Sequence, residues 1–263
     1  MPYRADIYDV VTPSSFRGDV EWYRRKASES GGPVLELGAG TGRITLAIAR
    51  AGVTVHALDA DQDMLDGLQA KLADESDAVR ARVVVIGGDM RTFELHDRFA
   101  LVIAPFRAFL HNLTDADRLA CLQRVHAHLR PGGAFAMNVF HPSLEYMAQN
   151  TGALAGVWRA AATVALADGG WLVRSESNRY DTINQRVESL HRYDEYAADG
   201  TLSRSSLHRL DLAYLYPADI RHLLMKAGFV SVEIAGGFDG RALHRDTDEL
   251  VVEARAVGAP PAI

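Results

Sequence analysis

Apolar runs and amphipathic segments alternate along the first 140 residues of the chain. Runs rich in valine, isoleucine and leucine occupy residues 34–37, 53–58, 82–86, 99–104 and 134–140. Segments with apolar positions three or four apart lie between them, and Asp61 and Thr114 are placed to cap two of these. Strands that alternate with helices at this spacing form a parallel sheet with helices on both faces. This part of the sequence predicts an α/β fold.

The pattern changes after residue 140. Residues 157–214 alternate between apolar and polar positions, and Asp168-Gly169-Gly170 and Asp199-Gly200 interrupt them. Aspartate followed by glycine between extended runs is typical of a hairpin turn. We expect three or four antiparallel strands here, as a small sheet inserted beside the main one. A helix from Pro217 to about Gly228 and strands at 229–234 and 250–256 complete the main sheet.

Composition narrows the classes of function. The chain has 263 residues, 48% of them hydrophobic and 24% charged, which suits one large domain or a domain with an insertion. Its net charge of −6 disfavours a nucleic-acid substrate. Cys121 is the single cysteine, so no disulfide can form within the chain and no Cys-x-x-Cys metal site exists; we expect no metal. The start lacks the layout of a signal peptide and no apolar run reaches eighteen residues, so we expect a cytoplasmic protein.

The segment VLELGAGTGR, residues 34–43, is the clearest candidate for a ligand site. It joins a short apolar strand to a helix through three glycines at alternate positions, Gly38, Gly40 and Gly42. Glycine lets the backbone turn sharply and approach a ligand, and ligands of α/β sheets bind at the carboxyl ends of strands. The dinucleotide fingerprint G-x-G-x-x-G needs its third glycine one residue later, and no Gly-Lys-Ser/Thr follows for a phosphate loop. A glycine-rich turn in some other α/β protein is the alternative.

These residues resemble motif I of the class I S-adenosylmethionine-dependent methyltransferases, an acidic residue followed by x and G-x-G-x-G. Glu36 takes the acidic position. The resemblance covers about residues 34–140 and 216–256, and it implies a seven-stranded Rossmann-like sheet whose last strand is antiparallel. The antiparallel insert between strands five and six is similar to that of small-molecule methyltransferases, including sugar N,N-dimethyltransferases. It divides the chain into a helical arm (1–32), a cofactor-binding core (33–156 and 215–257), a substrate cap and dimerisation insert (157–214) and a tail (258–263).

The resemblance implies S-adenosyl-L-methionine as the cofactor and suggests which residues hold it. Asp59, at the end of the second strand, would accept two hydrogen bonds from the ribose hydroxyls. Asp89 would accept one from the adenine amine, with Met90 packed on the ring. Either aspartate could instead be an ordinary turn or capping residue. The full set of predicted cofactor contacts is Glu36, Leu37, Gly38, Ala39, Gly40, Thr41, Gly42, Arg43, Asp59, Ala60, Met64, Gly88, Asp89, Met90, Ala104, Pro105 and Phe106.

Candidates for proton transfer and substrate binding follow the fourth and fifth strands. In the family, the loop after the fourth strand faces the transferred methyl group, so His111 is the candidate general base, with His141 as the alternative. A lone histidine beside an apolar helix start is more often structural, and this is the alternative for His111. Candidate substrate-binding residues are Tyr8, Arg107, Tyr146 and Trp158, because substrate pockets are mostly apolar and aromatic and an arginine binds carboxylate or phosphate.

We therefore expect an S-adenosylmethionine-dependent methyltransferase acting on N or O of a small molecule. The sequence does not choose between the two atoms. Other readings are an aminopropyl transferase, which needs an acidic cluster that residues 104–112 lack, and a nicotinamide oxidoreductase, which the glycine spacing opposes. A protein that binds the cofactor or its product without turnover is the non-enzymatic alternative. No nucleic-acid or membrane partner is expected, and the open edges of an inserted sheet suggest a homodimer.

Overall fold

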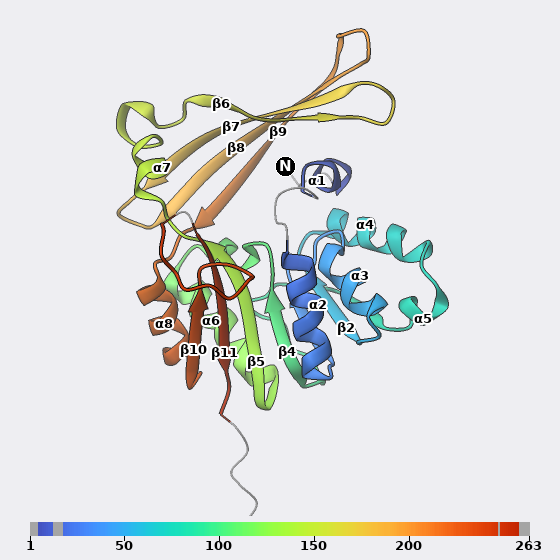
Figure 1. Ribbon diagram of the computed structural model, residues 1–263, viewed down its shortest axis with the longest axis vertical. Helices are drawn as coiled ribbons and strands as arrows, with labels where there is room; N and C mark the ends of the chain where they lie inside the picture. Colours follow the sequence, from blue (N-terminus) through green and yellow to red (C-terminus); the bar gives the residue numbers. More distant parts are fainter. Residues whose placement is uncertain (1–4, 13–17, 247, 258–263) are drawn as a thin grey trace, which may run out of the picture.

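The computed structural model describes residues 5–12, 18–246 and 248–257. Its main sheet has seven strands in the order β10-β11-β5-β4-β1-β2-β3 (Figure 1). Only β11 runs antiparallel to its neighbours, β10 and β5. The predicted α/β fold with an antiparallel last strand is confirmed. The strands are β1 (Val34–Leu37), β2 (Val55–Asp59), β3 (Val83–Gly87), β4 (Phe99–Ala104), β5 (Leu129–Phe140), β10 (Ser231–Ala235) and β11 (Glu249–Arg255).

Helices cover both faces of this sheet. On one face, Trp22 of α2 and Ile48 of α3 pack against Ile103 of β4. On the other, Leu122 of α6 and Leu224 of α8 pack against strand residues of the largest apolar cluster. The two layers explain why the strands are nearly continuous apolar runs, since both of their faces are buried. The helices are α2 (Asp19–Ser30), α3 (Arg43–Arg50), α4 (Gln62–Ala73), α5 (Asp77–Arg80), α6 (Asp115–His128) and α8 (Pro217–Lys226).

Capping residues begin the helices where the sequence predicts. The Asp61 carboxylate accepts a hydrogen bond from the Asp63 amide before α4. Thr114 and Asp117 form a reciprocal capping box before α6. Strand β5 departs from the expectation, because it begins at Leu129 rather than at residue 134. Its Pro-Gly-Gly stretch does not end the pairing with β4 but shifts the register between Phe99 and Leu101.

The insert is a separate four-stranded antiparallel sheet, β6 (Trp158–Ala165), β7 (Trp171–Asp181), β8 (Arg186–Tyr196) and β9 (Leu202–Ala213). The turns at residues 168–170 and 199–200 lie where the sequence predicts them, with Gly169 and Gly200 at positive φ. The turn between β7 and β8 was not predicted, and Gln185 adopts positive φ there. The sheet lies across the end of the main sheet reached by the carboxyl end of β5 (Figure 1).

One face of the inserted sheet packs toward the main domain. Helix α1 (Ala5–Val11) places Ile7 and Val11 against Leu172 and Tyr193. Farther along the same face, Val187 and Leu212, together with Leu210 and Tyr180, join the main core. Two short helices, α7 (Leu144–Ala148) and η2 (Gly152–Leu154), connect β5 to β6. A third, η1 (Ala108–His111), follows β4 and contacts β9 of the insert. Among the described residues, no helix is long and apolar enough to cross a membrane.

Candidate cofactor and substrate site

The loop after β1 needs its glycines for conformation and for space. Gly38, Gly40 and Gly42 have φ of 72°, 55° and 84°, which side chains rarely adopt. A Cβ on Gly42 would lie 2.2 Å from Leu68 Cδ1 of α4, and one on Gly38 would lie 2.6 Å from Ala108 Cβ of η1. Gly40 has nothing within 4 Å of that position. We call residues 38–42 the glycine loop; it forms a bare backbone surface at the carboxyl end of the sheet.

Asp59 lies at the end of β2 and supports the glycine loop directly. Its Oδ2 accepts a hydrogen bond from the Gly40 amide at 2.7 Å, and its Oδ1 accepts one from the Asp61 amide at 2.9 Å. Each carboxylate oxygen has two acceptor sites, so both can accept a further hydrogen bond. The position suits the predicted ribose contact and adds a structural role that the sequence did not reveal.

Asp89 is more heavily engaged than predicted. Both of its oxygens accept hydrogen bonds from the Arg91 guanidinium, which lowers the pKa of the Asp89 carboxyl. Arg91 also reaches Asp117 of α6 at 3.1 Å. An adenine amine would have to share this carboxylate with Arg91. Met90, predicted to pack on the ring, accepts a hydrogen bond at Sδ from Asn112 Nδ2 at 3.2 Å.

Glu36 is 1% exposed and lies beneath the glycine loop. It accepts a hydrogen bond from Thr45 Oγ1 of α3 at 2.5 Å. Burial raises the pKa of Glu36 to about 8, against the opposing effects of Thr45 and Arg43. Burial therefore favours the neutral form of the acidic residue of the motif.

Arg43 binds protein groups instead of pointing freely into the site. Its guanidinium pairs with both oxygens of Asp19, at 2.9 and 2.5 Å, and Asp19 is fully buried at the start of α2. It also lies 5.2 Å from the centre of the Phe106 ring, which Tyr8 of α1 meets edge-on at 6.0 Å. Asp19 was not singled out from the sequence, because a charged residue at a helix start is usually a solvated cap.

The remaining predicted cofactor contacts surround the same end of the sheet. Thr41 connects the glycine loop to α1, because the Thr41 hydroxyl donates a hydrogen bond to Asp9 Oδ1 at 2.6 Å. Lys71 of α4 pairs with the same carboxylate at 2.6 Å. For the buried positions, the backbone is the part left to contact a ligand. These are Leu37, Ala39, Thr41, Met64, Ala104 and Pro105, whereas Gly88 is partly buried and Ala60 is exposed. None of these cofactor contacts is tested directly, so they stay predictions.

The loop after β4, residues 105–112, faces the glycine loop across the Gly38–Ala108 contact. We call it the β4 loop. Phe106 and Arg107 both have positive φ, at 52° and 68°. Arg107 is paired with Glu249 of β11 at 3.0 Å, so a substrate anion would compete with this carboxylate. His111 keeps solvent access, yet the protein around it lowers its pKa by desolvation, partly opposed by the charge of Asp59. It lies on η1, which contacts β9 of the insert.

His141 lies apart from these groups. Its Nδ1 is 3.2 Å from the Asp246 carbonyl oxygen, and its ring meets Tyr216 edge-on at 6.1 Å. The histidine can accept a proton at Nε2 only if Nδ1 donates to that carbonyl. Both candidate histidines therefore stay predictions, and their contacts differ: His111 is a neighbour of Asp59, whereas His141 is a neighbour of Tyr216.

Tyr180 of the insert was not predicted from the sequence, and it lies beside the predicted residue Tyr146. Tyr146 donates to Glu176 Oε1 at 2.9 Å, and burial raises its pKa to about 12. Tyr180 follows it, with ring centres 6.2 Å apart. Burial raises the pKa of Tyr180, and the nearby Arg107 charge opposes that rise, so this part of the insert lies close to the β4 loop. Neither the alternation nor the turn pattern of the insert distinguishes Tyr180 from other strand residues.

Trp158 does not join Tyr146 and Tyr180. It pairs in register with Ser177, on the face of the sheet opposite to Glu176, and lies under the Arg192 guanidinium at 5.2 Å. Side chains alternate between the two faces of a strand, so the structure places Trp158 away from the main domain. The prediction that it lines the substrate pocket is therefore not supported by its position.

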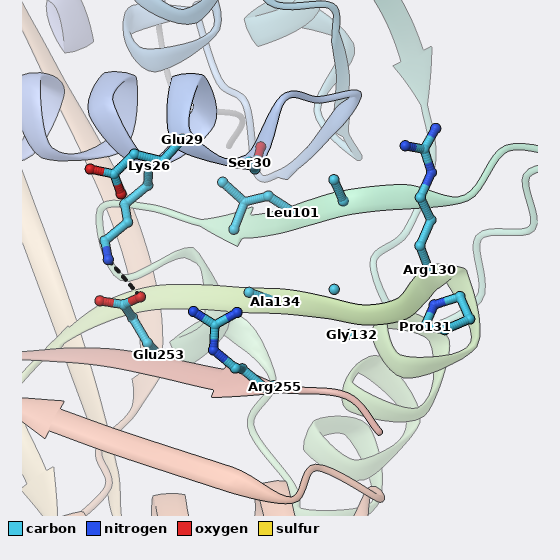
Figure 2. Close-up of a pocket in the computed structure, with 12 residues that line it drawn as sticks. Lys26, Glu29, Ser30, Leu101, Arg130, Pro131, Gly132, Ala134, Glu253 and Arg255 are labelled. Atoms are coloured by element: carbon cyan, nitrogen blue, oxygen red, sulfur yellow. Dashed lines mark hydrogen bonds and ion pairs between the residues drawn. The ribbon is translucent and has the colours of Figure 1, made fainter. Parts of the chain in front are cut away.

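A hollow lies at the end of the main sheet opposite to the glycine loop. Figure 2 shows Lys26 of α2 paired with Glu253 of β11, at 2.8 Å, beside Ala134 and Arg255. These side chains lie near the amino ends of β4 and β5. Since the glycine loop is at the carboxyl ends, this hollow plays no part in the site. Among the described residues no group of three or more histidine, cysteine or acidic side chains could hold a metal ion.

Comparison with known proteins agrees with this geometry. Residues 34–133 match the family model described as methyltransferase domain. The chain carries a methyltransferase domain. This stretch includes β1 to β4, the glycine loop, Asp59, Asp89 and the β4 loop. The family and fold predicted from the glycine motif are confirmed.

Relatives of this methyltransferase domain include enzymes named for N-methylation. The chain is 31% identical over 140 residues to the cypemycin N-terminal methyltransferase of a Streptomyces species, which covers 52% of this chain and 55% of the relative. It is 29% identical over 135 residues, 49% of this chain and 50% of the relative, to the dTDP-3-amino-3,6-dideoxy-alpha-D-glucopyranose N,N-dimethyltransferase of Streptomyces fradiae. The chain thus spans about half the length of the curated relatives it matches.

Solved structures extend the likeness to the insert. The CcbJ methyltransferase from Streptomyces caelestis superposes with a TM-score of 0.80 at 27% identity, over 96% of both chains. Other proteins of this fold were solved with S-adenosylmethionine, S-adenosylhomocysteine or sinefungin bound. The main sheet and the insert therefore occur together as one architecture.

Proposed function

We propose that this protein transfers the methyl group of S-adenosylmethionine to an amine nitrogen of a small molecule. The observation that carries the proposal is the glycine loop, with its bare backbone at the carboxyl end of β1, in a domain that matches the methyltransferase model. The nitrogen acceptor is supported by the Streptomyces fradiae relative, named an N,N-dimethyltransferase of an amino sugar, and by the cypemycin relative, named an N-terminal methyltransferase. The choice of nitrogen over oxygen as the acceptor atom is part of this proposal.

The residues present fit the cofactor. A Cβ at Gly38 would collide with Ala108, so glycine lets the two loops approach closely, and Gly40 has open space beside its backbone. Asp59 retains acceptor capacity for a diol. When bound, S-adenosylmethionine supplies a methyl group that is already strongly electrophilic. The protein then has to align the acceptor nitrogen with that methyl group and exclude water.

The β4 loop and the insert would perform that alignment. His111 is largely neutral near pH 7 because its pKa is lowered, so it can accept the proton that an ammonium acceptor must lose. Tyr180 and Glu176 of the insert, with Tyr146 of α7, form a polar aromatic wall near Arg107. We propose that residues 157–214 cap the substrate, and that residues 33–156 and 215–257 form the cofactor-binding core, with 1–32 as the N-terminal arm. The predicted tail, residues 258–263, lies outside the described residues.

The proposal is tested with matched acceptors and mass spectrometry. Purified protein is first analysed for a co-purifying adenosine derivative. It is then incubated with S-adenosylmethionine and pairs that differ only in amine or hydroxyl, such as glucosamine with glucose and a dipeptide with its hydroxy-acid analogue. Amine acceptors should gain one methylene in mass and release S-adenosylhomocysteine. Binding of S-adenosylhomocysteine without transfer to any amine would overturn the proposed function, and transfer only to hydroxyls would overturn the choice of nitrogen.

Assembly and location are further parts of the proposal. Leu144, Leu154, Val157 and Trp158 are exposed apolar residues before and at the start of β6, an edge strand of the insert. Such an edge favours pairing with a second copy, so we propose a homodimer through the insert. Light scattering showing only monomer at high concentration would contradict it. The net charge of −6 and the buried free thiol of Cys121 support a cytoplasmic enzyme without nucleic-acid or membrane partners, which cell fractionation would check.

A further inference from the structure

The β4 loop contains two consecutive residues in an unfavourable backbone conformation. Phe106 and Arg107 have φ of 52° and 68°, where only glycine is comfortable. Apart from Gln185 in the insert turn, no other non-glycine residue in the described parts of the chain has positive φ. Backbone conformations of this kind persist only where the surrounding structure enforces them. The contacts of these two residues show what does so.

Asn138, near the carboxyl end of β5, holds the backbone of both residues. Its side-chain Oδ1 accepts a hydrogen bond from the Phe106 amide at 2.8 Å, and its carbonyl oxygen accepts one from the Arg107 amide at 3.1 Å. Tyr23 of α2 donates to the same Oδ1 at 2.8 Å. Asn138 is fully buried, so these hydrogen bonds do not compete with water.

Glu249, at the start of β11, completes the arrangement. Its Oε1 accepts a hydrogen bond from Asn138 Nδ2 at 2.7 Å, which fixes the orientation of the amide. Its Oε2 lies 3.0 Å from the Arg107 guanidinium, whose carbon lies 5.1 Å from the Phe140 ring. The Glu249 carboxylate therefore contacts both Asn138 and Arg107. We call Asn138 and Glu249, with their contacts to Phe106 and Arg107, the clamp.

We propose that Asn138 and Glu249 are positioning residues for methyl transfer. They enforce the left-handed turn at Phe106 and Arg107, and that turn sets the distance between the glycine loop and the side of the site where the acceptor nitrogen approaches. The inference rests on the proposed function for its catalytic consequence. It concerns residues on β5 and β11, outside the glycine motif.

Loss of the clamp lowers turnover more than cofactor binding. The glycine loop and Asp59 belong to β1 and β2 and keep their contacts when the β4 loop relaxes. A displacement of about 1 Å of a positioning group costs about 100-fold in rate. Asn138→Ala should therefore lower kcat about 10–100-fold, while the affinity for S-adenosylhomocysteine falls by a smaller factor, through the predicted cofactor contact at Phe106. Glu249→Gln keeps an acceptor for Asn138 and should have a smaller effect of the same kind.

Glycine provides the test of mechanism, because it adopts positive φ without strain. Arg107→Gly and Arg107→Ala both remove the guanidinium, but only the alanine keeps the strain. If Asn138 enforces the turn, the glycine variant melts at a higher temperature than the alanine variant, and this gap shrinks when both are combined with Asn138→Ala. In the Asn138→Ala background, Arg107→Gly should also restore part of kcat, whereas Arg107→Ala should not.

These measurements separate the clamp from the proposed function. Melting temperatures and S-adenosylhomocysteine calorimetry need no acceptor; kcat uses the amine methylated fastest in the acceptor assay. If the melting temperatures of Arg107→Gly and Arg107→Ala differed by the same amount with and without Asn138, the clamp would be overturned. Equal losses of kcat and cofactor affinity would overturn it too. An inactive wild-type protein that still shows the unequal gaps would overturn the methyltransferase proposal and with it the catalytic role, leaving the backbone clamp standing. If Asn138→Ala does not fold, the same comparison is made with Glu249→Gln.

Discussion

The glycine loop and the β4 loop meet at one place but reach the same left-handed conformation by different means. The glycine loop uses residues without a Cβ at each position of positive φ. The β4 loop uses phenylalanine and arginine and depends on Asn138 from another strand. The first loop is therefore encoded locally, whereas the second exists only after the sheet has formed. We expect damage to the first to appear in cofactor binding and stability, and damage to the second in turnover.

The largest expected effect tests the catalytic side of this contrast. His111→Ala should lower kcat about 10²–10⁴-fold, the usual weight of general acid–base catalysis, with cofactor affinity unchanged. The lowered pKa of His111 places the acidic limb of the wild-type rate profile below 6.5, because the base must lose its proton to work. Steady-state kinetics against pH measure both. His141→Ala is the matched control; a greater loss from that variant would transfer the role to His141.

The next effect tests how far the glycine loop depends on space as well as on conformation. Gly42→Ala adds a Cβ that would lie 2.2 Å from Leu68 Cδ1 and keeps a positive φ. Strain and overpacking together should lower the free energy of unfolding by about 3–4 kcal/mol. Gly40→Ala has open space and should lower it by about 1 kcal/mol. Urea denaturation compares them, and equal losses would show that the Leu68 contact relaxes freely.

A third experiment examines the cofactor side directly. Asp59→Ala should weaken S-adenosylmethionine binding by about 1.5–3 kcal/mol, the range for hydrogen bonds to a charged group. Part of this loss comes from the Gly40 amide, which Asp59 also holds. Isothermal calorimetry measures the change, with Asp61→Ala, which removes only a helix cap, as the control. An Asp59 variant that folds and binds with unchanged affinity would remove this residue from the site.

The last experiment concerns the buried acid under the glycine loop, Glu36. The pKa of Glu36 is about 8 in the folded protein and near 4.5 in the unfolded chain. Between these values the folded state keeps a proton that the unfolded state loses, so rising pH removes stability. The free energy of unfolding of Glu36→Gln should therefore rise above that of wild type as the pH increases toward 8.5, and this difference should vanish toward pH 4.5. Parallel stability curves at both pH values would show that Glu36 is ionised in the fold.

The sequence predicted the elements that carry local signals. The glycine motif, the caps at Asp61 and Thr114 and the aspartate–glycine turns each record a conformation in neighbouring residues, and the structure confirms them. The early start of β5 was not predicted, because Pro131 and two glycines normally end a strand and only pairing with β4 overrides that tendency. Long-range polar contacts were missed for the same reason. Asp19 meets Arg43, and Asn138 meets Glu249, across sequence gaps that no periodicity records.

The position of β11 has a consequence for how the protein is made. In the main sheet β10 pairs only with β11, and β11 fills the space beside β5. A nascent chain that has not yet released residues 249–255 from the ribosome can pair β1 to β5 but has an open β5 edge and no Glu249. The glycine loop and the hydrogen bonds from Asn138 can form before β11 is synthesised, whereas the contacts of Glu249 to Asn138 and Arg107 require β11. The contacts of Glu249 to Asn138 and Arg107 therefore form only after the segments predicted to bind the cofactor have been synthesised.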